Sequence, residues 1–278
     1  MSSSFEPAHA PALVDIGVNL TAPVFADDLG EVLARARAAG VPLALVTGTD
    51  VDHSRQALAL AEAHPGELFA TAGVHPHAAS AVAPGWIQAL EQLAANPRVR
   101  AIGETGLDFN RDYSPRPDQE RVFTAQLELA ANLERPVFLH ERDSGGRFFD
   151  LLEPFRDQLA GGVLHCFTGN ERDLDRALSA GLHIGITGWI CDERRGVELQ
   201  GLVTRIPSER LLLETDAPWL LPRTIRPRPK SRRNEPARLP WVLAKVAECR
   251  GEDPQRLAKA TTRNACRLFG LPLPSGSD

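Results

Sequence analysis

Four side chains that can bind a metal ion each stand where a short apolar run of the sequence stops. Glu104 follows the run RAIG, His140 follows PVFL, and His165 follows GGVL. Asp216 lies in LLLETDAP, and His75 ends a fifth run, LFATAGVH. One buried histidine is usually satisfied by a hydrogen bond and carries no chemistry. Five nitrogen and oxygen donors at the ends of apolar runs instead favour a metal-dependent hydrolytic site.

These residues would meet if the apolar runs are the strands of a (β/α)8 barrel, because the carboxyl ends of all its strands lie at one face. The runs are almost continuously apolar, which is typical of parallel strands that helices cover. We therefore predict an α/β fold of the TIM-barrel type. The predicted strands span residues 13–19, 42–49, 68–75, 100–108, 136–141, 161–166, 183–188 and 211–217.

Amphipathic spacing between these runs predicts the covering helices. They span residues 27–40, 53–64, 119–133 and 172–180, and two further helices follow the last strand at 236–250 and 254–269. A doubly wound open sheet is the alternative, but no GxGxxG motif follows any predicted strand. A length of 278 residues suits a single barrel domain over about residues 12–270, and we expect residues 1–11 and 272–278 to be flexible tails.

Composition limits the classes of function. With 31 basic and 36 acidic residues the net charge is −5, which argues against coating nucleic acid through the overall field, so that any site for a polyanion must be local. The four cysteines show no CxxC spacing, and we expect reduced thiols. The N-terminus lacks a signal-peptide pattern, and no apolar run approaches the length of a membrane span. We expect a cytoplasmic monomer without a membrane segment.

Motifs at the ends of the predicted strands resemble those of the TatD family of metal-dependent deoxyribonucleases. They are DIGVNL, GVHPH, GETGLDF, LHERD, LHCFTG and ETDAP, together with GITGWICDERRG and SRRNEP. The resemblance covers essentially the whole chain. It implies a TIM-like barrel of the amidohydrolase type, a divalent metal at the strand ends, and hydrolysis of DNA phosphodiester bonds from the 3′ end of single strands.

The resemblance also implies roles for particular residues. Asp216 would accept a proton from the attacking water, and Glu104 and His75 would be further catalytic residues. Glu214 would face the same side of a regular strand as Asp216 and is a reserve candidate. Imidazoles favour Zn²⁺ or Mn²⁺, whereas carboxylates and phosphate favour Mg²⁺, which the family resemblance also indicates. The implied metal ligands are Glu104, His140, His165 and Asp216.

One departure from the family pattern lies on the first strand. Many members carry two metal-binding histidines there, at the positions of Gly17 and Asn19. Glycine cannot bind a metal, and asparagine offers only a neutral carbonyl. We therefore expect one firmly held ion beside a weaker, substrate-assisted one. The subgroup that this chain most resembles shares the DIGVN string, so the change is compatible with activity.

A basic segment, RTIRPRPKSRR, spans residues 223–233 and contains no acid. A solvated charged loop is the simplest alternative for such a run. However, loops after the seventh and eighth strands face the active site of a barrel, and arginine binds phosphate with two parallel hydrogen bonds. Near the strand ends, Phe109, Tyr113, Phe167 and Trp189 would either stack on bases or pack in the core. The predicted phosphate ligands are Arg194, Arg195, Arg223, Arg232 and Arg233.

Three functions are compatible with these residues. The first is a nuclease for single-stranded DNA, with RNA as a further substrate. The second is a metal-dependent amide or ester hydrolase, such as an aminoacyl-tRNA deacylase, and the third is a binding protein whose metal site has decayed. The basic segment favours the first over the second, because a small neutral amide does not require a row of cations. The retention of Glu104, His140, His165 and Asp216 together disfavours the third.

Overall fold

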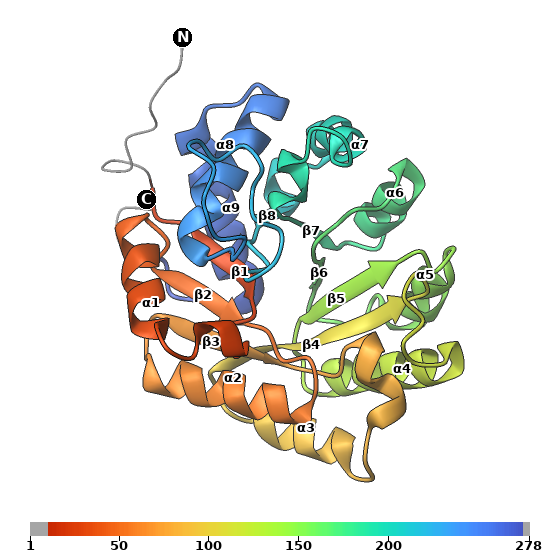
Figure 1. Cartoon of the computed structure of the whole chain (residues 1–278). Coiled ribbons are helices and arrows are strands. Elements are labelled where there is room, and N and C mark those ends of the chain that lie inside the picture. Colours follow the sequence, from red (N-terminus) through yellow and green to blue (C-terminus); the bar gives the residue numbers. More distant parts are fainter. Residues whose placement is uncertain (1–10, 275–278) are drawn as a thin grey trace.

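Eight parallel strands follow one another around a closed sheet in chain order. The computed structural model describes residues 11–274. Backbone hydrogen bonds join the segment after the last strand to the end of the first, from Asp216 N–H to Gly17 O at 2.9 Å and from Asn19 N–H to Ala217 O at 2.8 Å. The predicted TIM-like barrel is therefore confirmed (Figure 1). The strands are β1 (Val14–Val18), β2 (Leu43–Val46), β3 (Leu68–Ala72), β4 (Val99–Asp108), β5 (Val137–Arg142), β6 (Gly162–Leu164), β7 (His183–Ile186) and β8 (Leu211–Leu213).

Helices connect the strands and cover the outside of the barrel. The last helix has a capping residue at each end: the Asp253 side chain accepts the Arg256 N–H at its start, and Gly270 ends it at φ 60°. The α-helices of the described residues are α1 (Leu29–Ala38), α2 (Val51–Ala63), α3 (Trp86–Ala94), α4 (Arg116–Asn132), α5 (Arg147–Leu152), α6 (Glu171–Ser179), α7 (Val197–Leu202), α8 (Leu239–Arg250) and α9 (Pro254–Phe269).

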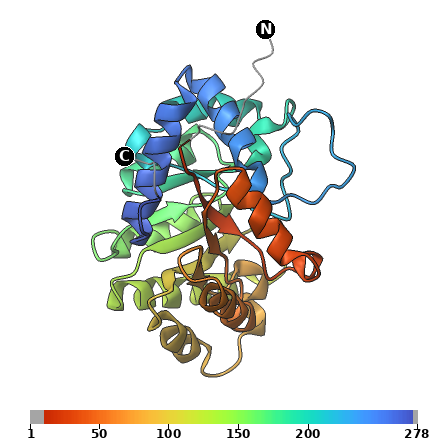
Figure 2. The same cartoon turned by 90° about the vertical axis from the view of Figure 1, so that its left-hand side faces the viewer.

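The core has two layers. One lies between the strands and the outer helices, and the other fills the inside of the barrel. The C-terminal part of α9, the dark blue helix along one side of Figure 2, joins the inner layer through Ala265, Cys266 and Phe269. Because Val14 and Leu43 begin their strands, α9 covers the end of the barrel opposite the strand C-termini. The inner strand residues are Val14, Ile16, Leu43, Leu45, Phe69, Ala101, Phe138, Val163 and Leu212.

Strand β4 ends at Asp108 as predicted, but Glu104 does not end it, and β3 is shorter than predicted. Strand β4 continues beyond Glu104 to Asp108, so Glu104 lies within the strand and not at its end. The side chain of Gln119 stabilises this extension, because its Oε1 accepts the Asp108 N–H at 2.8 Å. Strand β3 ends at Ala72, and His75 therefore lies in the following loop, where it caps a short 3-10 helix, η3 (Pro76–Ala81).

The remaining expectations concern the tails, the thiols and membranes. The predicted tails lie outside the described residues, except for residues 11 and 272–274. Cys166, Cys191, Cys249 and Cys266 are free. None of the described helices is both long and apolar enough to cross a bilayer.

Candidate active site

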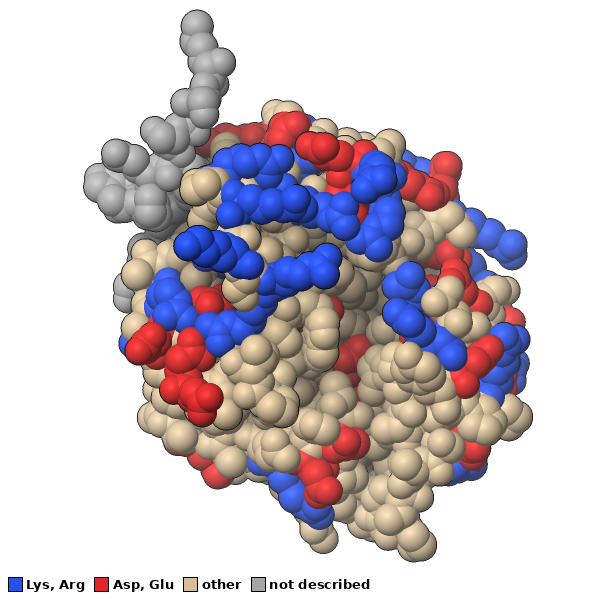
Figure 3. All heavy atoms as spheres, in the orientation of Figure 1, with Lys and Arg blue, Asp and Glu red and all other residues tan. Residues whose placement is uncertain are grey.

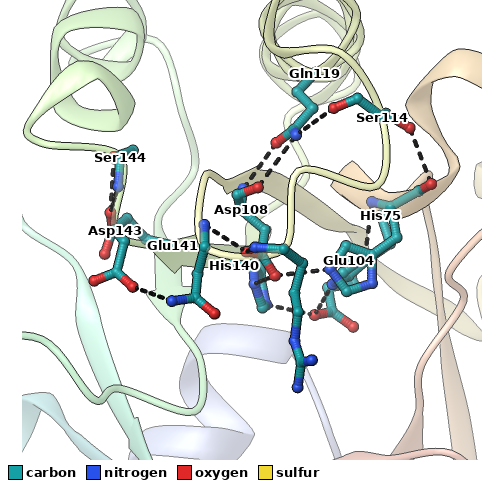
Figure 4. Close-up of polar contacts among 12 residues, drawn as sticks. His75, Glu104, Asp108, Ser114, Gln119, His140, Glu141, Asp143 and Ser144 are labelled. Carbon is teal, nitrogen blue, oxygen red and sulfur yellow. Dashed lines mark hydrogen bonds and ion pairs between the residues drawn. The ribbon is translucent and has the colours of Figure 1, made fainter.

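The carboxylate of Glu104 is the centre of a polar cluster at the C-terminal ends of the strands. Its Oε1 lies 2.8 Å from His165 Nε2, 3.1 Å from His140 Nδ1 and 3.2 Å from His75 Nε2. Figure 4 shows Glu104, His75 and His140 pointing toward one another from β4, the loop after β3, and β5. A buried carboxylate is unfavourable unless its negative charge is balanced. This arrangement therefore requires protonated imidazoles or a bound cation.

Protonation in the cluster is strongly perturbed. Burial alone would raise the pKa of Glu104, but His165 and His75 hold it well below its usual range, so Glu104 is ionised. Burial lowers the pKa of His75 to about 4, because the Glu104 charge offsets only part of the desolvation. The pKa of His165 lies well above its usual value because the carboxylates of Glu104 and Glu214 outweigh the effect of burial. Neutral His75 can therefore offer a lone pair.

The donors in this cluster fit a divalent cation. His75, Glu104 and His140 each offer one ligand atom, and these atoms lie within 4.8 Å of one another. His140 Nε2 is buried without a hydrogen-bond partner among the described residues, and an Asp108 oxygen lies 3.5 Å away. A buried polar atom without a partner is unfavourable and calls for an explanation. Nitrogen and oxygen donors in this combination are suited to Zn²⁺, Mn²⁺ or Mg²⁺.

Glu214 orients His165 from behind. Its Oε2 lies 3.3 Å from His165 Nδ1, and its Oε1 accepts the Cys166 N–H at 2.5 Å. With Nδ1 held by Glu214, Nε2 of His165 faces Glu104. A Cβ atom at Gly17 would lie only 2.4 Å from Glu214 Oε2. The fully buried Glu214 thus occupies the space beside the first strand where a side chain at position 17 would lie.

Asp216 lies beyond the end of β8, on the same side of the barrel. Its Oδ1 accepts a hydrogen bond from Asn19 Nδ2 at 3.0 Å, so the Asn19 amide faces Asp216 with its nitrogen. Burial raises the pKa of Asp216 to about 8, and the charges of Glu104 and Glu214 act in the same direction. Asp216 adopts φ 50°, a left-handed conformation that aspartate tolerates better than most residues. A carboxyl group of this kind can exchange a proton near neutral pH.

All five predicted metal and catalytic residues line one cavity of about 500 Å³. The same cavity is lined by Arg142, Trp189 and Trp219, whose side chains lie around the buried acids and histidines. Figure 3 shows a hollow with acidic side chains inside and basic side chains gathered along part of its rim. The five residues are His75, Glu104, His140, His165 and Asp216.

Several predicted phosphate ligands gather around Asp192. This aspartate accepts the backbone N–H groups of Arg194 and Arg195, at 3.0 and 3.1 Å, and lies 2.9 Å from Arg195 Nε. Arg223 Nε is 3.3 Å from the same carboxylate. A concavity of about 390 Å³ adjoins this group. Its basic lining residues are Arg194, Arg223, Arg226 and Arg228.

Arg233 does not join this group. Its guanidinium contacts Asp28 at 2.7 and 2.9 Å and Glu235 at 3.0 Å, and only 20% of its side chain is exposed. The ion pairs raise the pKa of Arg233 above its already high value. Because these carboxylates already occupy its donors, Arg233 holds the loop to α1 and is not free to bind phosphate. Arg232 is exposed and forms no ion pair within the described part of the chain.

The aromatic candidates separate into two kinds. Phe167 is 3% exposed and belongs to the core, and Phe109 lies beneath the Arg116 guanidinium at 4.4 Å. Tyr113 is 65% exposed, and its ring contacts His77 with a centroid distance of 4.7 Å. Trp189 lines the cavity beneath Arg195, which lies 4.5 Å from its ring. Tyr113 and Trp189 are therefore the two that remain accessible to a base.

Three features of the site were not anticipated from the sequence. Trp219 is 56% exposed at the cavity, directly after the ETDAP motif. His77 Nε2 lies 2.7 Å from Asp108 Oδ2, and both residues belong to motifs named above, GVHPH and GETGLDF. Arg142 follows His140 by two residues on β5. The period of two along a strand was the signal that could have identified Arg142.

Comparisons with known proteins agree with this geometry. Residues 14–270 match the family described as TatD related DNase. The chain is 55% identical over 263 residues to a protein named 3'-5' ssDNA/RNA exonuclease TatD from Citrobacter rodentium, with 95% of this chain and all (100%) of that protein covered. A protein of the same name from Klebsiella pneumoniae is 55% identical over 259 residues, covering 93% of this chain and 98% of that protein.

Solved structures give the same result for the fold. The crystal structure of YjjV, a TatD homolog from Escherichia coli K12, superposes with a TM-score of 0.84 at 30% identity, and the match covers 94% of this chain and 98% of that chain. A TatD-family hydrolase from Entamoeba histolytica gives a TM-score of 0.86 at 24% identity, covering 95% of this chain and 100% of that one. At that identity the second likeness supports the fold alone.

Proposed function

The chain belongs to the TatD-related DNase family, and from this premise we propose that it is a metal-dependent exonuclease that shortens single-stranded DNA, and RNA, from the 3′ end. The observation that carries the proposal is the single Glu104 oxygen shared by three imidazoles in a cavity with a basic rim. Relatives at 55% identity bear the name of this activity. Hydrolysis of a phosphodiester needs an activated water and compensation of phosphate charge, and this cavity is suited to both.

The proposed metal ligands include both carboxylates and imidazoles. A bound divalent ion supplies a Lewis acid for the phosphate and a water of lowered pKa. We propose Mg²⁺, with Mn²⁺ or Zn²⁺ as alternatives, because the set mixes carboxylates with imidazoles and the substrate adds phosphate oxygens. The ligands would be Glu104, His140, His165 and Asp216, and neutral His75 would complete the set.

Asp216 is the proposed proton acceptor. Asn19 donates to its Oδ1, which leaves Oδ2 to take a proton from the attacking water. Burial raises its pKa to about 8, so the ionised form of Asp216 is a stronger base than an ordinary aspartate. Glu214 positions His165, since it holds Nδ1 of that ring at 3.3 Å. Asn19 would therefore hydrogen-bond to the proton acceptor and would not be a metal ligand.

The nucleic acid strand would pass the arginines around Asp192. Arg194 and Arg223 are exposed there, and Arg226 and Arg228 extend the same concavity. Guanidinium groups bind phosphate oxygens in pairs, which positions a backbone without reading its bases. Arg195 and Arg232 are secondary candidates, because neither lines the concavity. We also propose a cytoplasmic monomer, and the free thiols are compatible with a reducing compartment.

Degradation of end-labelled oligonucleotides tests this function. We expect single-stranded DNA to shorten from the 3′ end, duplex DNA to resist, and EDTA to stop the reaction until Mg²⁺, Mn²⁺ or Zn²⁺ is restored. A 5′ label should give a ladder of shortened products, and a 3′ label should be released at once as a short product. Activity that survives EDTA, or internal cleavage without end dependence, would reject the proposal. Deacylation of aminoacyl-tRNA without strand cleavage would support the amide or ester hydrolase instead.

A further inference from the structure

Arg142 lies at the active-site cavity on the same strand as a proposed metal ligand. It ends β5, two residues after His140, and it lines the cavity of about 500 Å³ together with His140 and Glu104. The strand holds it in place, because the Arg142 carbonyl accepts the Phe109 N–H at 2.9 Å. Its side chain is half-buried. The backbone of a cationic residue is therefore held beside the cluster, on a regular element and not on a loop.

The Arg142 guanidinium lacks the carboxylate partner that neighbouring arginines have. Arg195 and Arg223 contact Asp192, at 2.9 and 3.3 Å. Arg142 forms no ion pair within the described residues, and its guanidinium carbon lies 5.9 Å from the centre of the Trp189 ring. Half-buried arginines normally have a hydrogen-bonding partner, since the group has five donors. This one faces a cavity in which its natural partner would be an anion.

The acids near Arg142 do not account for it. A shallow hollow of about 260 Å³ adjoins the active-site cavity and is lined by Arg142 with Glu141 and Asp143. However, Glu141 Oε1 accepts from the Ser144 backbone and hydroxyl at 2.9 and 2.7 Å. Asp143 Oδ2 accepts from Asn110 Nδ2 at 2.8 Å. These carboxylates are satisfied by other donors, so Arg142 remains available to a ligand.

We propose that Arg142 binds a non-bridging oxygen of the scissile phosphate. The inference rests on the proposed function. In the hydrolysis the water oxygen bonds to phosphorus, the bond from phosphorus to the leaving sugar oxygen breaks, and one proton from water ends on that oxygen. Charge on the non-bridging oxygens changes during this exchange, and a guanidinium in a partly desolvated site stabilises that charge. Arg142 differs in this respect from Arg194 and Arg223, which would hold flanking phosphates.

A small diester separates the two roles. Bis(p-nitrophenyl) phosphate has a scissile phosphate but no flanking ones. With it, Arg142→Ala should lower kcat roughly 100-fold and change KM little, because removing one charge-stabilising donor typically costs 10²–10³ in kcat. Arg142→Lys should retain part of the rate, and free guanidinium ion should partly restore Arg142→Ala. Arg156→Ala is the control, since Arg156 pairs with Glu153 and Asp157 on the outer surface, away from the cavity.

Two further measurements exclude a structural role. The melting temperature and the bound metal per protein should be unchanged in Arg142→Ala. A kcat within about threefold of the wild type, or a loss of activity that follows a loss of bound metal, would overturn the proposal.

Binding of inorganic phosphate to the metal-loaded protein tests Arg142 independently of nuclease activity. We expect Arg142→Ala to weaken phosphate binding at least tenfold by calorimetry, and equal affinity would overturn the inference. If the wild type binds phosphate or cleaves the small diester but leaves single strands intact, the proposed function fails while this test of Arg142 still stands.

Discussion

Glu214 fills the space that a side chain at position 17 would need. Its Oε2 would lie 2.4 Å from a Cβ at Gly17, and the Phe138 ring would lie 3.0 Å from the same atom. The sequence shows that residue 17 is a glycine, but not what surrounds it. In the structure, the carboxylate that orients His165 lies directly beside this glycine. A histidine at position 17 would therefore have to displace Glu214.

Gly17→Ala should consequently destabilise the protein. We expect a loss of about 1–3 kcal/mol in the free energy of unfolding, the usual effect of overpacking a tight core, and a weaker hold on His165. Urea unfolding of the metal-free protein measures it. Gly30→Ala is the matched control, because Gly30 lies exposed in α1 with no atom within 4 Å of its added Cβ, and there alanine should stabilise by about 0.5–1 kcal/mol. Equal stability of the two variants would contradict the steric argument.

Glu104→Gln and His165→Ala should abolish metal-dependent activity while the protein stays folded. Each change removes a donor from the cluster around Glu104 Oε1. We expect activity to fall by at least about 100-fold, because even the partners of metal ligands contribute 10–100-fold. Metal analysis and circular dichroism should show less bound metal and an intact fold. His64→Ala, at the end of α2, is the control histidine variant. Near-normal turnover at low metal concentration in either cluster variant would show that the assignment is wrong.

The sequence predicts some properties of individual residues and not others. The strand-end pattern was sufficient to bring His75, Glu104, His140, His165 and Asp216 to one cavity. It could not tell Arg233, which contacts Asp28 from a distant part of the chain, from arginines that stay free. Nor could it identify Trp219, because exposure depends on the path of a loop. Ion pairs between distant residues and loop paths are three-dimensional properties that spacing does not encode.

At the scale of elements, helix α4 positions two strand ends through buried glutamines. Gln119 holds the end of β4, accepting the Asp108 N–H at 2.8 Å and donating to Ser114 O at 2.8 Å (Figure 4). Gln126 accepts the Val74 N–H at 2.7 Å and donates to Thr105 Oγ1 at 2.6 Å. Val74 and Thr105 are the direct neighbours of His75 and Glu104. The helix therefore sets the spacing of the two cluster residues through one amide.

Gln126→Leu tests this coupling. The variant leaves the Val74 N–H and C=O without their partner, and we expect the free energy of unfolding to fall by about 1–3 kcal/mol. Activity should fall further than stability explains, because His75 and Glu104 lose their common support. Thermal unfolding and oligonucleotide cleavage below the unfolding transition measure the two effects. Glu128→Gln, on an exposed position of the same helix, should change neither. Normal activity in folded Gln126→Leu would remove the positioning role.

Elements also differ in how well sequence predicts them. The helix predicted at 254–269 has those same bounds in α9, because Asp253, Pro254 and Gly270 mark its ends. Helices α5 and α7, with six residues each, could not be delimited, since fewer than two turns give no clear period. The predicted end of β4 at Asp108 is confirmed, whereas β3 ends at Ala72 and not at His75.

At the scale of the molecule, a buried acid closes the barrel. Asp15 on β1 accepts the Thr215 N–H at 2.9 Å and contacts the Thr215 hydroxyl at 2.5 Å, across the junction with the segment after β8. Burial raises the pKa of Asp15 to about 7, although the bonds from Thr215 act in the opposite direction. The folded protein thus keeps a proton on Asp15 up to a pH at which the unfolded chain has lost it.

This shift predicts how stability depends on pH. The unfolded carboxyl group titrates near pH 4, so between about pH 4 and pH 7 the unfolded chain binds fewer protons at this group. Stability should therefore fall with rising pH in that window, by up to roughly 1 kcal/mol per pH unit from this group. In Asp15→Asn this contribution disappears, and the decline should become shallower. Urea unfolding of both metal-free proteins from pH 4.5 to 7.5 measures the difference, and parallel curves would contradict the shift.

Salt dependence tests the proposed path of the strand across the molecule. Exchanging Arg194 and Arg223 for alanine should raise KM for oligonucleotides more than it lowers kcat, because flanking phosphates are bound alike in the ground and transition states. The slope of log affinity against log salt should flatten by about 1.4, since each lost contact to a single strand removes about 0.7. Arg233→Ala should instead lower stability and leave the slope unchanged, because Arg233 is paired with Asp28 and Glu235. A flattened slope in Arg233→Ala alone would reverse this assignment.

The packing of α9 into the inner core has a consequence for synthesis of the protein on the ribosome. The inside of the barrel contains side chains from β1 and from α9, so it cannot be sealed before residues 254–271 have emerged. At about 5–20 residues per second, this delay between β1 and α9 is on the order of 10–50 s. During that time Ile16, Leu45 and Phe138 lack their final cover, and such apolar surface attracts chaperones or other nascent chains. The yield of folded protein in cells should therefore depend on chaperones that bind unfolded chains, even though the completed barrel is stable.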